Sequence, residues 1–210
     1  MDTILDKLGV YDFWGTFFPG LVGMIILRIC GLDLIDYGKE KYLVYIVIVI
    51  MSLSYLLGII LHELGHFVQD HFIYKNGEPC DNFLLHNSIF YEDEKKIYLK
   101  LYTKWAKKNQ IDKELDKKIC RLFFNYCDYY ISKNNNHIQS TKMQSIYGMS
   151  RSLFIFFGVI AVCGLIKLQL HIFIVSLSLL LLFYFRTIRF NEIRLKVVMR
   201  TYLVEIEKEK

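Results

Sequence analysis

Acidic side chains are almost absent from the apolar stretches of this 210-residue chain. Lys167 is the only Lys, Arg, Asp or Glu between residues 153 and 185. A membrane-embedded site that needs a carboxylate ligand from this stretch is therefore excluded. The five cysteines are odd in number and irregular in spacing, so we expect no structural disulfide. No small-residue cleavage site follows the first apolar run, so we expect no secretory signal peptide.

Apolar residues are abundant, and their arrangement indicates a membrane protein. The composition is 54% hydrophobic and the mean hydropathy is +0.29, which excludes an ordinary soluble domain of this size. Residues 42–61 form a run of about twenty nearly uncharged residues, the number that an α-helix needs to cross a hydrocarbon core. We expect an all-α membrane protein with four transmembrane helices, built on the apolar runs 13–29, 42–61, 153–166 and 168–185.

Basic residues after the last apolar run predict the orientation. Lys and Arg are frequent in the short tail 187–210, and such residues are typical of the cytoplasmic side. We therefore expect both termini to be cytoplasmic, and the formal charge of +5 to reflect this topology and attraction to anionic lipid. The predicted regions are an N-terminal amphipathic segment with two spans at 1–70, a cytoplasmic helical region at 71–149, a transmembrane hairpin at 150–186 and an amphipathic tail helix at 187–210.

Helical spacing of apolar residues predicts the helices of the cytoplasmic region. We expect one helix at 92–109, another at 112–133, and a third from about residue 138 that continues into the third span. Such a region is too small to bury much apolar surface alone, so we expect it to pack on the tail helix or on another subunit.

Small residues recur on one face of each of the first two spans. Pro19 has no N–H group and leaves the carbonyl of Gly15 without its usual donor, so we expect a kink there. Small faces let helices approach closely in lipid, within or between subunits. No span has a polar stripe of its own, so a pore would require a homo-oligomer. The predicted packing residues are Gly15, Pro19, Gly23, Ser54, Gly58 and Gly65.

The second apolar run leads directly into the motif His62-Glu63-Leu64-Gly65-His66. In zinc metalloproteases with this HExxH pattern, the two histidines share a zinc ion and the glutamate is the general base. The motif resembles two families of membrane metalloprotease. Intramembrane site-2-type proteases need an Asp ligand in a later span, which this chain lacks. The other family takes a downstream Glu ligand, for which Glu92 and Glu94 lie at a possible distance.

The alternative reading of this motif is structural. On a helix-packing face, His62 and His66 would form hydrogen bonds at the level of the lipid headgroups. We favour this non-enzymatic reading and expect no bound cofactor. The alternative is a small zinc metalloprotease in which Glu63 is catalytic.

Ionisable residues at membrane depth are functional candidates by default. With the predicted topology, Asp12, Glu63, Arg151 and Arg186 fall near the same inner interface, where they would either pair with one another or anchor the helices. Aromatic residues within 123–130 lie among basic residues and would suit base stacking. Aromatic residues at helical spacing are more often core, so we do not expect a nucleic-acid partner.

Three short patterns occur together: YDxxGxxxPG at 11–20, SYLLG at 54–58 and YGMSRSL at 147–153. Together they resemble small four-span inner-membrane proteins found in bacterial anti-phage defence loci beside a sensor protein. In similar proteins the position of His62 often has a non-catalytic context. The resemblance implies an oligomeric protein of the bacterial inner membrane that disrupts the membrane or receives a signal, with a cytoplasmic sensor or effector protein as its partner. A membrane scaffold is the remaining alternative.

Overall fold

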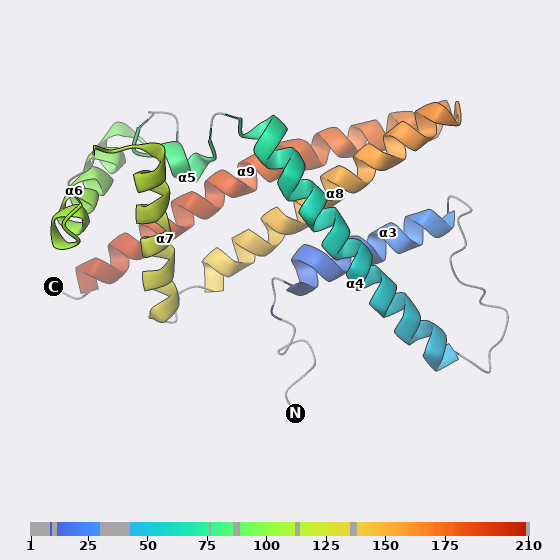
Figure 1. Cartoon of the computed structure of the whole chain (residues 1–210), viewed down its shortest axis with the longest axis horizontal. Helices are drawn as coiled ribbons and strands as arrows, with labels where there is room; N and C mark the ends of the chain where they lie inside the picture. The colour runs from blue at the N-terminus through green and yellow to red at the C-terminus, as the bar shows by residue number, and fades with distance from the viewer. Residues whose placement is uncertain are drawn as a thin grey trace. The chain divides into compact units, whose positions relative to one another are not determined.

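The computed structural model describes residues 9, 12–29, 43–75, 77–85, 89–111, 114–134 and 138–208. Every regular element in these ranges is a helix (Figure 1). The chain divides into two compact units. The first, here called the membrane unit, comprises Met1–Gln69 and Gln144–Ile188, and the second unit comprises Asp70–Met143 and Arg189–Lys210. Most of the predicted N-terminal amphipathic segment and the loop after the first apolar run lie outside the described residues.

Three helical stretches are long and apolar enough to cross a membrane: Val44–Ile73, Ile138–Ile166 and Leu170–Lys208. The first consists of α4 (Leu43–Val68) and the π-helix η3 (Gln69–Ile73), and the others are α8 (Ile138–Ile166) and α9 (Leu170–Lys208). The described residues confirm the expected all-α fold, and the length and composition of these three helices support a membrane protein. The apolar helix over Phe13–Arg28 is shorter, about 24 Å long at 1.5 Å per residue. The fourth span therefore stays a prediction.

The first apolar run starts with a wide turn before a buried proline. The π-helix η1 (Phe13–Phe17) precedes α3 (Phe18–Ile29), and the N–H of Phe18 bonds the carbonyl of Phe13. Pro19 supplies no N–H group of its own, so the regular ladder is interrupted at this point. The interruption lies where the sequence predicted a kink.

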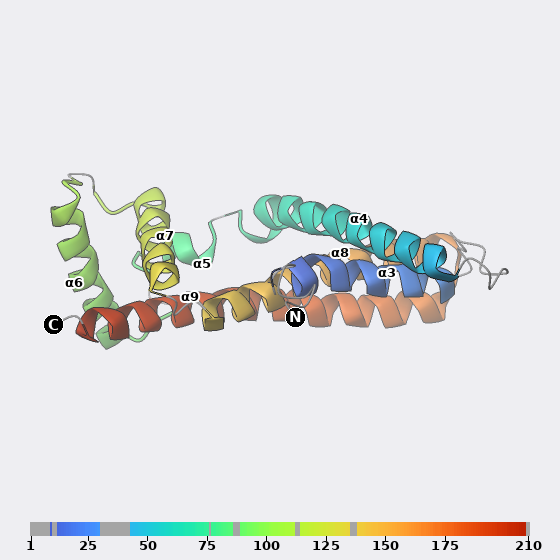
Figure 2. The ribbon, with the colours of Figure 1, turned by 90° about the horizontal axis from the view of Figure 1, so that it is seen from below.

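Two glycines let η1 and α3 lie directly against α4 (Figures 1 and 2). A Cβ atom on Gly20 would overlap the backbone carbonyl of Ser54, and one on Gly58 would overlap that of Thr16. These backbones therefore pack at a separation that no larger residue allows. The contact is made within one chain.

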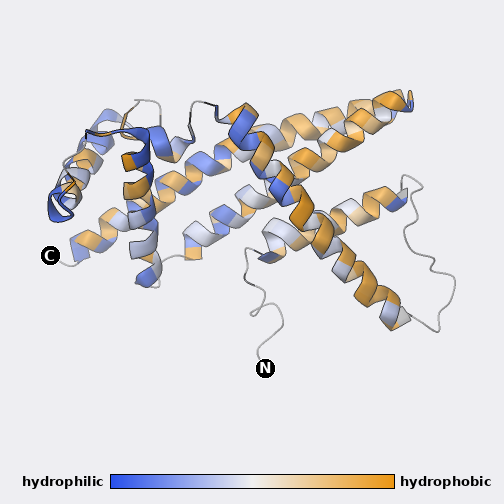
Figure 3. Ribbon diagram, viewed as in Figure 1, coloured by the Kyte–Doolittle hydropathy of each residue, from blue (hydrophilic) through white to orange (hydrophobic). Residues whose placement is uncertain are grey.

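The outer surface of the membrane unit is apolar. Figure 3 shows hydrophobic residues along most of α4 and along the hairpin of α8 and α9. On α4, large side chains such as Val44, Ile48 and Ile60 are more than half exposed. An apolar surface of this extent is typical of a lipid-facing helix bundle.

The second unit has its own core. It contains α5 (Pro79–Asn82), α6 (Glu92–Lys108), α7 (Lys117–Lys133) and the end of α9. Phe123 is fully buried and lies against Trp105 of α6 and Tyr202 of α9. The residues of 187–208, expected as a separate tail helix, form the last part of α9 and contribute Leu195, Val198, Met199 and Tyr202 to this core.

Candidate functional site: a buried arginine in the membrane unit

Arg151 lies in the middle of α8 and is only 4% exposed. Its Nη2 atom is 2.8 Å from Nε2 of His62 on α4, and its Nη1 atom is 3.2 Å from Oε1 of Gln69 on η3. The amide of Gln69 donates to the hydroxyl of Tyr147, whose ring centre is 5.4 Å from the guanidinium carbon. One arginine therefore joins α8 to both parts of the second apolar helix.

Small residues around Arg151 provide the space for its long side chain. A Cβ atom on Gly65 would lie 2.8 Å from Cγ of Arg151, so this position accepts nothing larger than glycine without a shift. The neighbouring Ser152 is fully buried and donates to the carbonyl of Gly15 at 3.4 Å. This is the carbonyl that Pro19 leaves without its usual helical donor. The small residues of the packing faces therefore lie directly around the polar side chains of Arg151 and Ser152, inside an apolar bundle.

Within the described ranges, the groups that contact the Arg151 guanidinium are the uncharged side chains of His62, Gln69 and Tyr147. A guanidinium is always protonated in proteins and only donates hydrogen bonds, so the nitrogen of His62 beside it accepts. Among the described residues no carboxylate lies within ion-pair distance of Arg151, and its Nε atom has no hydrogen-bond partner. Holding a desolvated cation without a counter-charge at membrane depth costs several kcal/mol, on the order of the 2.5–3.5 kcal/mol found for arginine at a helix centre.

The other ionisable residues that the sequence indicated are exposed or only half-buried. Glu63 and His66 are exposed on α4, and Asp12 is exposed at the start of η1. Arg186 is half-buried on α9. The structure therefore brings Arg151 to His62, whereas Glu63 faces the surroundings of the bundle.

This arrangement bears on the zinc interpretation of HExxH. Arg151 lies 2.8 Å from Nε2 of His62, so the lone pair of that nitrogen accepts from the guanidinium and is not available to a zinc ion in this conformation. Within the described ranges, no three His, Cys, Asp or Glu side chains lie close enough to share a metal ion. In this conformation His62 is a hydrogen-bond acceptor for Arg151.

Gln69 was not predicted from the sequence, and Tyr147 was identified only as the first residue of the pattern at 147–153. A signal for Gln69 is present in the spacing. Residues 54, 58, 62 and 65 share one helix face, and a further step of four along that face reaches 69. The HExxH pattern assigns roles to residues 62, 63 and 66 and carries no signal for residue 69.

The second unit has a polar cluster of a different kind. Nε of Arg121 on α7 lies 2.6 Å from Oδ1 of Asp81 on α5, and its Nη2 lies 3.2 Å from Oε2 of Glu78. The bond to Asp81 raises the pKa of Arg121 further above its ordinary value. Burial, with the nearby Glu78 and Asp81 carboxylates, raises the pKa of the Cys80 thiol to about 12. Cys80 therefore stays protonated at neutral pH, which lowers the nucleophilicity of its sulfur.

Comparison of the chain with protein-family models, curated proteins and solved structures found no match. The site of Arg151 is ordered by hydrogen bonds and close helix packing, and no carboxylate of the residues that the structure describes neutralises its charge. Chemically, it can bind an anion or a carboxylate, or exchange its neutral partners for water.

Proposed function

We propose that this protein is a multi-pass inner-membrane protein of a bacterial anti-phage defence system, which acts as a homo-oligomer. Its role is that of a membrane-perturbing effector or of the regulated membrane partner of a cytoplasmic sensor. The three patterns at 11–20, 54–58 and 147–153 support the defence setting. The observation that carries a membrane-acting role is the buried Arg151, whose charge no described carboxylate neutralises.

A buried membrane cation of this kind suits a two-state device. The resting state is the one described, with Arg151 bonded to His62 and Gln69. Because its partners are neutral, an anionic group or water competes well for the guanidinium. If α4 and α8 separate, the charge becomes available to lipid phosphate or to water, and the apolar bundle loses a cross-link. Such a change perturbs the bilayer without any enzymatic step.

The chain also provides a route for a signal. Helices α8 and α9 each contribute residues to both units, and α9 supplies the second unit with part of its core. Binding of a sensor protein to the second unit would therefore act on helices that continue into the membrane unit. We propose that this coupling biases the contact between Arg151 and His62.

Infection of cells that express the protein tests the proposal. A bacterial host carrying the gene, with and without its neighbouring genes, is challenged with a set of phages while a potential-sensitive dye reports on the membrane. We expect protection accompanied by loss of membrane potential during infection. A host whose survival and membrane potential are the same with and without the protein, both during infection and on overproduction, would contradict the proposal and favour a scaffold.

A further inference from the structure

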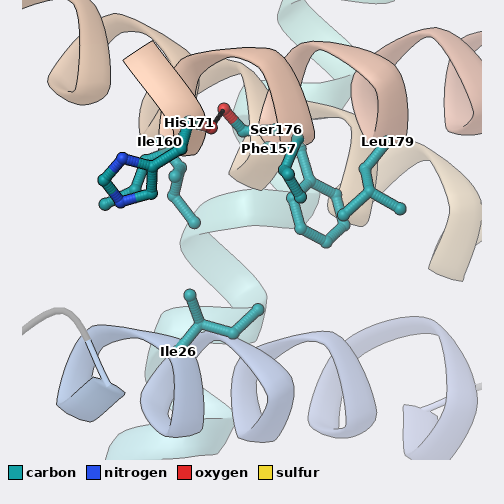
Figure 4. A pocket seen from close by; sticks show the side chains of 8 residues that line it. Ile26, Phe157, Ile160, His171, Ser176 and Leu179 are labelled. Carbon is teal, nitrogen blue, oxygen red and sulfur yellow. Dashed lines mark hydrogen bonds between the residues drawn. The ribbon is translucent and has the colours of Figure 1, made fainter. Parts of the chain in front are cut away.

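An apolar cavity of about 340 Å³ lies between α3 and the hairpin of α8 and α9. Figure 4 shows Ile26 of α3 on one side of it, with Phe157 and Ile160 of α8 and Leu179 of α9 across from it. All of these residues belong to the membrane unit. The volume falls within the range of about 300–1,000 Å³ that ligand pockets occupy.

The lining of the cavity admits hydrocarbon and little else. Besides His171, its one polar side chain is Ser176, and the hydroxyl of Ser176 already donates to the carbonyl of Ile172 at 2.6 Å. A polar ligand group inside the cavity would therefore lose its hydrogen bonds to water without replacement. Burial of a methylene group is favourable by about 0.8 kcal/mol, so a saturated chain suits this space.

Basic residues lie at one end of the cavity. His171, in the first turn of α9, lines it, and Lys167 lies exposed in the turn that joins α8 to α9. The C-terminal end of α3, whose last turn contains Arg28, lies at the same end of the membrane unit as this turn (Figures 1 and 2). The sequence has no Asp or Glu from residue 129 to residue 191, so the hairpin supplies no acid to balance Lys167.

We infer that this cavity holds an acyl chain of an anionic phospholipid whose phosphate lies beside His171 and Lys167. The apolar lining fits the chain, and the basic residues at its end fit the phosphate. A Lys or Arg near an anionic membrane surface is attracted to it by about 1 kcal/mol. The site is distinct from that of Arg151 and holds whether or not the protein acts in phage defence.

Native mass spectrometry of the full chain in detergent tests the site. The probes are a phosphatidylglycerol and a phosphatidylcholine with identical acyl chains, so that only the headgroup differs. We expect the wild type to retain the anionic lipid at lower concentration than the zwitterionic one. Lys167→Gln should weaken retention of the anionic lipid about fivefold and leave the zwitterionic lipid unchanged, whereas Lys142→Gln, at an exposed position earlier on α8, should change neither.

A variant that fills the cavity distinguishes an acyl chain bound inside it from lipid that only coats the helices. Ile160→Trp places an indole ring in the cavity. Val162→Trp adds the same ring two residues away, at an exposed position of the same helix. Ile160→Trp should abolish specific retention, and Val162→Trp should retain the lipid as the wild type does. Equal retention by the two variants, or no preference of the wild type for the anionic headgroup, would overturn the inference.

A wild-type measurement covers the case in which Ile160→Trp fails to fold. An anionic phospholipid with a photoreactive diazirine in its acyl chain is reconstituted with the protein and cross-linked, and the modified peptides are mapped. We expect modification to concentrate in residues 157–160 and 172–179. Modification spread evenly over the exposed apolar face of α4 would show that lipid merely coats the helices and would also overturn the inference.

Discussion

At the scale of single residues, Gly58 illustrates how the helices of the membrane unit come together. A Cβ atom there would overlap the backbone of Thr16, which has no flexible end to move away. At Gly158 on α8, the nearest atom to an added Cβ is Cδ1 of Leu180 at 3.3 Å, and that side chain can rotate. We expect Gly58→Ala to destabilise the protein by about 1–3 kcal/mol and Gly158→Ala to have little effect. Thermal unfolding in detergent measures both, and equal melting temperatures would show that the close contact is not needed.

Glu63 is the residue that separates the two interpretations of HExxH. It is exposed on α4, and the adjacent His62 is bonded to Arg151. Glu63→Gln keeps the shape of the side chain but removes its capacity as a general base. We expect this variant to protect cells from phage as well as the wild type does. Loss of protection, together with about one zinc ion per chain in the purified wild type, would indicate a zinc protease instead.

The sequence predicted Arg151 and the small residues of its site, but not the residues that bond to Arg151. The small residues at 15, 58 and 65 and the importance of Arg151 follow from spacing and from the rarity of membrane charges. The partner of Arg151 cannot be predicted in the same way, because the rotation of α8 about its own axis relative to α4 decides whether Arg151 contacts residue 62 or residue 63. These neighbours point about 100° apart on a helix, so only the tertiary packing selects between them.

At the scale of secondary-structure elements, Arg121 links α5 to α7 through a partly buried ion pair. Asp81 is buried, so removal of the guanidinium would leave its carboxylate without a counter-charge. We expect Arg121→Ala to cost about 1–2 kcal/mol, less than a fully buried pair because Arg121 is half exposed. The matched control is Lys96→Ala, which breaks an exposed pair with Asp93 within α6 and should cost less than about 0.5 kcal/mol. Hydrogen exchange at α5 measures the effect, and equal protection in the two variants would contradict the role of Arg121.

The expected and observed helix boundaries agree where the sequence marks the end of a helix clearly. The first cytoplasmic helix was expected at 92–109 and is observed at Glu92–Lys108. The next was expected from 112, but α7 begins at Lys117 because the side chain of Asp116 accepts the N–H of Ile119 at 2.7 Å and caps the helix. The tail was expected as a separate helix. It continues α9 because no Gly or Pro occurs between Leu170 and Lys208 to interrupt the backbone hydrogen bonds.

At the scale of the whole molecule, the topology is the prediction that the rest depends on. The arginine-rich tail predicts that residues 71–149 and both termini face the cytoplasm. Single cysteines introduced at positions 36 and 110, with the native cysteines replaced, test this in intact cells. A membrane-impermeant thiol reagent should label position 36 and not position 110. Labelling at position 110 before the cells are broken would reverse the orientation.

The central question for the whole protein is whether Arg151 is retained for function at a cost to stability. Arg151→Met keeps much of the side-chain volume and removes the uncompensated charge, so we expect the melting temperature in detergent to stay the same or rise. Protection against phage and the loss of membrane potential during infection should both disappear. Lys142→Met, at an exposed position of the same helix, should preserve stability and activity. Full protection by a stable Arg151→Met variant would contradict a functional role, and a large fall in its melting temperature would make Arg151 a structural residue.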